Sequence, residues 1–115
     1  MDREESQAGK SPFLALGEDV PIAKGVCVFP IEISNGATER PFKTTVFRVA
    51  AGSSTPMDEH RVEEMWIVLK GTGLLEYESE KMRICELDRL FFPSLRTHRV
   101  TNDSAQVLQI LSIYW

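Results

Sequence analysis

The sequence predicts an all-β protein built as a single antiparallel β-barrel or sandwich. The first observation is a series of about seven or eight short apolar runs at fairly regular spacing, separated by turn residues. The second is that helical periodicity is weak throughout the chain. The one arguable helix, 56–64, holds one or two turns at most and leads directly into a strand, so a hairpin is expected there. The third is the length of 115 residues, which leaves room for one core.

The expected strands are short and rich in apolar, β-branched and aromatic residues. Turn signals such as Ser34-Asn35-Gly36 and Gly71-Thr72-Gly73 separate them. The run 44–50 also alternates between apolar and polar residues, as a half-buried strand does. Residues 1–12 are polar and charged and are expected to form a flexible arm, with residues 13–115 as the single domain. The runs span 25–33, 44–50, 64–70, 74–78, 81–87, 90–92, 98–101 and 107–115.

Composition and charge exclude several classes of function. The net charge of -4 argues against a nucleic-acid surface, which normally presents a basic face. The apolar runs are far shorter than the roughly 20 residues that a membrane span needs. The chain starts with acidic residues where a secretory peptide has a basic and then an apolar region, so a cytoplasmic location is expected. No phosphate-binding loop, dinucleotide fingerprint or nucleophile elbow occurs.

The two histidines suggest a metal site. Asp58 and His60 are two residues apart, so an extended segment directs both to the same face. A turn at 61–63 would fold Glu64 back opposite this pair, and His98 would arrive from a third strand. Two imidazoles and two carboxylates suit a first-row divalent ion. Residue by residue, the alternative is a pair of hydrogen-bonded histidines and solvated turn carboxylates.

The wider spacing resembles the two sequence motifs of the cupin superfamily. The resemblance covers about residues 42–115 and implies a small single-domain cupin with a jelly-roll barrel. It also implies one divalent ion (Fe, Zn, Mn or Ni) held by Asp58, His60, Glu64 and His98. The first motif is matched by Gly52, Asp58, His60, Glu64 and Gly71, and the second by Asp88, Pro93, His98 and Asn102.

The chain departs from the cupin pattern at three positions. Asp58 stands where the family usually has a histidine, and Leu87 and Leu95 stand where the second motif has glycines, so the backbone there is expected to differ. If Asp58 is a ligand, the charge of the ion and its four ligands becomes zero instead of +1, which favours harder ions. If it is not, His60, Glu64 and His98 form the triad that suits Fe(II).

Strand alternation also suggests which side chains face the ion. From Glu64, it places Trp66 and Val68 on the same face. From His98, it places Arg96 at the mouth of the pocket and Val100 inside. Arg48 lies midway along an apolar strand, and two roles stay open for it: holding a substrate carboxylate or pointing outward. Glu64 and His98 are the candidate catalytic residues.

The resemblance implies several functions. The leading hypothesis is a metal-dependent enzyme, a lyase, isomerase or oxygenase, acting on a small polar metabolite in specialised metabolism. The metal would serve as a Lewis acid or as a platform for O₂. The alternatives are a non-catalytic small-molecule-binding cupin and a metal-free structural barrel. A further alternative is a module of an amino-acid-activating, hydrazine synthetase-like system that forms N–N bonds, because 63–68 and 110–115 look similar to such modules. A homodimer is expected, with residues 13–33 supplying an edge strand.

Overall fold

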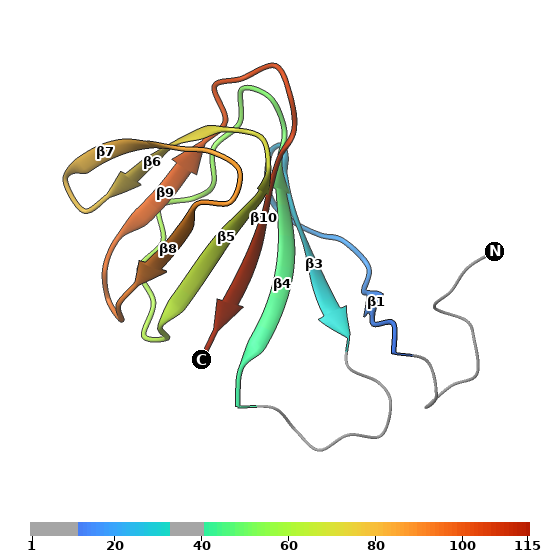
Figure 1. Ribbon diagram of the computed structural model, residues 1–115. Coiled ribbons are helices and arrows are strands. Elements are labelled where there is room, and N and C mark those ends of the chain that lie inside the picture. The colour runs from blue at the N-terminus through green and yellow to red at the C-terminus, as the bar shows by residue number, and fades with distance from the viewer. Residues whose placement is uncertain (1–11, 33–40) are drawn as a thin grey trace.

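Two antiparallel sheets face each other in the computed structural model, which describes residues 12–32 and 41–115 (Figure 1). The larger sheet has the order β1-β3-β4-β10-β5-β8, with β2 also paired to β3, and the smaller sheet has the order β7-β6-β9. The all-β prediction is therefore confirmed. The strands are β1 (Ala15–Leu16), β2 (Val20–Ala23), β3 (Val26–Glu32), β4 (Lys43–Val49), β5 (Glu64–Lys70), β6 (Gly73–Tyr77), β7 (Glu80–Ile84), β8 (Arg89–Phe92), β9 (His98–Thr101) and β10 (Leu108–Tyr114).

The expected strands agree with β3 to β10 within a few residues at each end. The short strands β1 and β2 were not predicted, and together they flank β3 on the side away from β4. The expected arm, apart from its last residue, and the turn at 34–36 lie outside the described residues. Within the described part of the chain, no helix is long and apolar enough to cross a membrane.

The segment before β5 differs from the expected hairpin. It contains no helix, and Asp58 forms an isolated antiparallel bridge with His98 of β9. The backbone N–H of each of these residues donates to the carbonyl oxygen of the other, at 3.0 Å in both directions. The segment is thus fastened to the smaller sheet rather than to β5.

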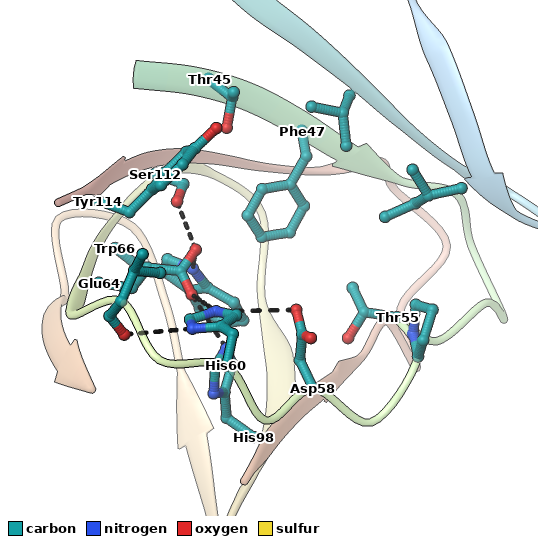
Figure 2. A pocket seen from close by; sticks show the side chains of 14 residues that line it. Thr45, Phe47, Thr55, Asp58, His60, Glu64, Trp66, His98, Ser112 and Tyr114 are labelled. Atoms are coloured by element: carbon teal, nitrogen blue, oxygen red, sulfur yellow. Dashed lines mark hydrogen bonds and ion pairs between the residues drawn. The ribbon is translucent and has the colours of Figure 1, made fainter. Parts of the chain in front are cut away.

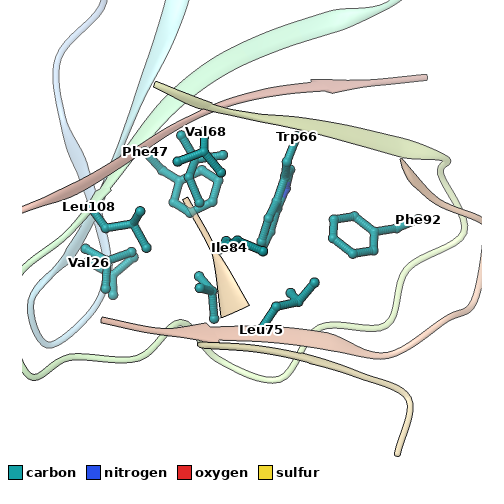
Figure 3. Close-up of a cluster of buried hydrophobic side chains, with 11 residues drawn as sticks. Val26, Phe47, Trp66, Val68, Leu75, Ile84, Phe92 and Leu108 are labelled. Atoms are coloured by element: carbon teal, nitrogen blue, oxygen red, sulfur yellow. The ribbon is translucent and has the colours of Figure 1, made fainter. Parts of the chain in front are cut away.

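The core fills the space between the two sheets (Figure 3). Along β5 the buried residues are Glu64, Trp66 and Val68, whereas the alternate residues Met65 and Ile67 are only partly buried. This period of two follows from the pleat of a strand, which directs successive side chains to opposite faces. The inner face of β5 therefore carries apolar core residues at one end and the candidate ligand Glu64 at the other.

Leu87 and Leu95 adopt the left-handed conformation that glycine favours, with φ of 71° and 66°. The expectation that the backbone differs at these positions was wrong. Hydrogen bonds hold both turns: the N–H of Leu87 donates to the carbonyl oxygen of Val68 at 2.9 Å, and that of Leu95 to His60 at 2.8 Å. The left-handed conformation costs about 1–2 kcal/mol at each leucine. The hydrogen bond of Leu95 attaches the second turn to the segment that carries His60.

Asn102 ties the turn after β9 to the larger sheet. Its side-chain amide is fully buried and donates to the carbonyl oxygens of Val49 at 2.9 Å and Gln106 at 2.6 Å. Its side-chain oxygen accepts from the backbone N–H of Ser104 at 3.0 Å, so Asn102 caps this turn.

Asn102→Ala is expected to lower the free energy of unfolding by about 2–3 kcal/mol, because it leaves buried backbone groups without partners. Chemical denaturation measures this loss. Asp103→Ala in the same turn is the control, because Asp103 forms an exposed ion pair with Arg83. It should cost no more than about 1 kcal/mol. Equal losses in the two variants would contradict this account of the turn.

Candidate metal centre

One end of the space between the sheets opens into a cavity of about 460 Å³ (Figure 2). Strand β5 supplies Glu64 and Trp66 to its wall, β9 supplies His98, and the segment before β5 supplies Asp58 and His60. The remaining walls come from β2, β3, β4 and β10 and from the loops around them. The other lining residues are Ile22, Val28, Thr45, Phe47, Thr55, Pro56, Val62, Ser112 and Tyr114.

The four candidate ligands of the sequence analysis lie together in this cavity. Oε1 of Glu64 is 3.0 Å from Nε2 of His60 and 3.0 Å from Nε2 of His98. Oδ2 of Asp58 is 3.9 Å from Nε2 of His60. Possible ligand atoms of Asp58, His60 and His98 all lie within 4.8 Å of one another. His98 is buried, whereas His60 is partly exposed and Asp58 is exposed, so the cluster is open toward the cavity on the Asp58 side.

Glu64 is held as a carboxylate by three donors besides His60. Trp66 donates from Nε1 to Oε2 of Glu64 at 2.9 Å, and the hydroxyl of Ser112 donates to the same oxygen. Burial by itself raises the pKa of Glu64, but hydrogen bonds from His98, Ser112 and Trp66 outweigh burial and hold the pKa at about 2. Trp66 and Ser112 therefore occupy Oε2 of Glu64, and Oε1 faces the imidazoles of His60 and His98.

The two histidines present the same ring nitrogen to Glu64. Nδ1 of His60 lies 3.2 Å from the carbonyl oxygen of Val62, and Nδ1 of His98 lies 3.2 Å from that of Arg96. A carbonyl oxygen only accepts, so both Nδ1 atoms carry protons and both Nε2 atoms are left to bind a cation. The ring of His98 is further fixed by stacking on Phe92, with centroids 4.2 Å apart.

This donor set fits a divalent cation. Without a cation, each Nε2 faces a carboxylate oxygen that also only accepts, so an Nε2 needs a proton to bond to Glu64. Burial lowers the pKa of His98, but its hydrogen bond and charge interaction with Glu64 outweigh burial and raise the pKa above the usual value. A metal ion would take the place of such protons between three or four converging ligand atoms.

Metal binding is therefore expected to release about one proton per ion near neutral pH, because Nε2 of His98, whose pKa is raised, must lose its proton to become a ligand. The apparent affinity should fall as the pH is lowered through the raised pKa of His98, where the proton competes with the ion. Titration calorimetry in buffers of different ionisation enthalpy measures the number of protons released. Binding without proton release below pH 7 would contradict the protonation of this cluster.

The five candidate pocket residues occupy different places. Trp66 lines the cavity and also packs in the core, with Phe47 and Phe92 edge-on to its ring. Val68 and Val100 are completely buried in the core and do not line the cavity. The two arginines, described next, also lie outside the lining.

Arg48 and Arg96 have partners elsewhere in the fold. The inward neighbour Phe47 lines the cavity, so Arg48 projects from the opposite face of β4. There its Nε donates to Gln109 at 2.7 Å, and its guanidinium lies 4.6 Å from the ring centroid of Phe29. Arg48 was expected either to hold a substrate carboxylate or to point outward, and this placement agrees with the outward orientation. Arg96 is mostly exposed and pairs with Glu78.

Several lining residues were not identified from the sequence. Ser112 and Tyr114 lie on β10, where Tyr114 is the register partner of Glu64 and Ser112 that of Trp66. Thr45 lies opposite Ser112 on the other neighbour of β10. The alternation within β10 was visible in the sequence, but it did not show which of its two faces points inward until the pairing with β5 was known.

The fold and the cluster define a class of protein: an all-β barrel with histidines and carboxylates gathered at the open end of its interior. Comparison with known families agrees with this class. The model of the cupin domain matches residues 45–114. The chain therefore belongs to the cupin family, as its motifs suggested.

Solved structures of several cupins share the fold. A cupin 2 conserved barrel domain protein from Salinispora arenicola superposes with a TM-score of 0.74 at 20% identity, covering 83% of this chain and 79% of the other. An RmlC-like cupin from Shewanella frigidimarina gives 0.72 at 12% identity, covering 85% and 82%. The uncharacterized protein MJ1618 of Methanocaldococcus jannaschii is 31% identical over 64 residues, which are 55% of this chain and 51% of that protein. The matched region thus spans about half the length of this relative.

Proposed function

We propose that this chain is a metal-dependent cupin enzyme that binds one divalent ion through His60, Glu64, His98 and Asp58. A small metabolite would occupy the cavity beside the ion, and specialised biosynthesis inside the cytoplasm is the proposed setting. The observation that carries the proposal is the convergence of both imidazole Nε2 atoms on one ionised carboxylate oxygen at the wall of a 460 Å³ cavity. The bound ion would supply Lewis acidity or, if it is iron, a site for O₂.

The residues of this site have different proposed roles in holding the ion and the bound molecule. Trp66 and Ser112 hold Oε2 of Glu64, which leaves Oε1 as the ligand atom. With a pKa of about 2, Glu64 is a weak base, so its proposed part is that of a ligand rather than of a proton acceptor. The backbone carbonyls of Val62 and Arg96 orient the imidazoles, a type of outer contact that typically raises metal affinity 10–100-fold. The apolar wall around Phe47 would shield a bound molecule from water.

Turnover of metabolites tests the enzymatic part of the proposal. Protein loaded separately with Fe(II), Zn(II), Mn(II) or Ni(II) is incubated with a small-molecule extract, and mass spectrometry follows consumption and product formation. The matched control is His98→Phe, which keeps a ring against Phe92 and removes the ligand nitrogen. A metabolite consumed by the loaded wild type and not by the control supports an enzyme. Retention of a metabolite without conversion by any loaded form would favour the non-catalytic binding cupin instead.

We also propose that two copies pair through the larger sheet. Beside polar residues such as Arg48, the outer face of this sheet carries a group of apolar side chains where a solvated face would be mostly polar. Leu111 is the register partner of both Val46 and Ile67, and Met65 pairs with Phe91. Phe91 is 51% exposed. Apolar residues grouped on one sheet face, of which Met65, Ile67 and Leu111 are partly exposed, are typical of interfaces. Self-association through one shared face would give a two-fold dimer with β1 to β3 at its edge.

Leu111→Arg is expected to convert the dimer into a monomer, because it would bury a charge at the centre of the outer face. Light scattering at tens of micromolar measures the mass of the particle. Glu80→Arg on β7 is the control, since it places the same side chain on the smaller sheet and should leave the dimer intact. A wild-type monomer at this concentration would contradict the proposed pairing.

A further inference from the structure

The charges around the cavity restrict the kind of molecule that fits it. Among the described residues that line the cavity, none is a lysine or an arginine, whereas Asp58 and Glu64 are acidic. A divalent ion with these two carboxylates and neutral imidazoles sums to zero, since +2 and two charges of −1 cancel. A cupin site with histidine at position 58 would instead carry +1. An anionic molecule therefore finds no net positive charge in this cavity.

Four described cations lie next to lining residues or close to the cavity without lining it. Arg61, between the lining residues His60 and Val62, is exposed and is not part of the lining. Arg48 projects from the other face of β4 and bonds to Gln109. Arg96 is exposed and pairs with Glu78. Lys43 lines a neighbouring depression of about 290 Å³, which shares Val62 and Tyr114 with the cavity but not the candidate ligands.

The part of the cavity lining that carries no charged residue suits an uncharged molecule. Ile22, Val28, Phe47 and the face of Trp66 form its apolar wall. Next to Phe47 on the same face of β4 is Thr45, and Tyr114 lies on the neighbouring strand β10. The hydroxyls of Thr45 and Tyr114 have no hydrogen-bond partner within the described residues, so they are available to a ligand. Thr45 and Ser112 lie opposite each other on adjacent strands, which places this polar edge beside the group that holds Glu64 (Figure 2).

We propose that the cavity selects an electrically neutral small molecule with an apolar, ring-sized body and a hydrogen-bonding edge, and discriminates against carboxylate anions. This inference rests on the proposed metal site and names the class of its substrate. A carboxylate entering the cavity would lose its hydration, which is costly in an apolar site. It would meet no lysine or arginine among the described lining residues, and the only cation there would be an ion whose charge Asp58 and Glu64 already balance. A neutral amide of the same shape can bond to the hydroxyls at a smaller desolvation cost.

Benzamide and benzoate are near-isosteric probes that separate these two cases. Their dissociation constants are measured by ligand-observed NMR with the zinc-loaded, full-length protein, and the zinc content of the same sample is determined. Benzamide is expected to bind at least about ten-fold more tightly than benzoate, a difference of about 1.4 kcal/mol. Equal or tighter binding of benzoate would overturn the inference while leaving the metal site intact. The same holds if benzamide shows no binding at about 10 mM, a dissociation constant that corresponds to about −2.7 kcal/mol. A sample that holds no zinc would overturn the metal site, and the inference with it.

A charge added inside the cavity provides the matched comparison. Thr45→Lys introduces a cation on the inner face of β4, and it should raise the affinity for benzoate relative to benzamide. Thr44→Lys introduces the same side chain on the outer face and should leave the preference of the wild type unchanged. An identical shift in both variants would show that general surface charge decides the preference, which would also overturn the inference.

Discussion

His98→Ala is expected to lower the affinity for a divalent ion by more than about 100-fold, because it removes the most buried ligand of the cluster. Only 2% of His98 is exposed, and its Nε2 lies 3.0 Å from Glu64. Competition with a chromophoric chelator measures the affinity, and His60→Ala should show a loss of the same kind.

Loss of the fold has to be distinguished from loss of a ligand in this experiment. His98 packs on Phe92 and against Trp66, so alanine also leaves a cavity. His98→Phe retains an aromatic ring in that place without a ligand nitrogen. Both variants should lack metal, and the phenylalanine variant should show the smaller loss of thermal stability when both are compared with metal-free wild type. Wild-type affinity in a folded His98→Phe protein would contradict the assignment of His98.

Asp58→Ala is expected to weaken metal binding by about 10–100-fold, and Asp58→Asn is expected to lie between this variant and the wild type. The carboxylate of Asp58 is on the exposed side of the cluster, 3.9 Å from Nε2 of His60. An asparagine oxygen can still coordinate, but without the charge that attracts the cation. Asp58→His should restore the ligand set usual in cupins and retain metal. Chelator competition across the three variants orders their affinities.

The neighbouring residue supplies the control for the Asp58 series. Glu59 carries the same charge, is exposed and lies outside the cavity lining. Glu59→Ala should leave the affinity within about two-fold of the wild type, since exposed charges at this distance are screened by solvent. If Asp58→Ala behaved like Glu59→Ala, Asp58 would not be a ligand. The site would then be the open triad of His60, Glu64 and His98, which favours Fe(II) and oxygen chemistry.

Much of the fold was visible in the sequence because its strands carry strong local signals. Strands β4 and β5 are apolar and β-branched, and Gly71 follows β5 with a φ of 91°. A Cβ at Gly71 would lie 2.7 Å from the carbonyl oxygen of Val107, so glycine is required there. Strands β1 and β2 carry weaker signals, since β1 has two residues and β2 contains a proline.

The four candidate ligands were predictable from the motif spacing, whereas the other residues of the site were predictable only as far as single strands define a face. Glu64 and Trp66 share a strand, so alternation placed both on one side. Ser112 could not be assigned in this way, because its position depends on the register between β10 and β5. The bridge between Asp58 and His98 is a single pair outside any regular strand, and local sequence carries no signal for it.

The central claim is that one divalent ion binds where Asp58, His60, Glu64 and His98 meet. Anomalous diffraction from crystals of the zinc-loaded protein, recorded on both sides of the zinc absorption edge, tests it most directly. The predicted result is one strong anomalous peak per chain, in contact with Nε2 of both histidines, Oε1 of Glu64 and a carboxylate oxygen of Asp58. A peak elsewhere in the chain, or no peak at this cluster in crystals grown with excess zinc, would contradict the claim.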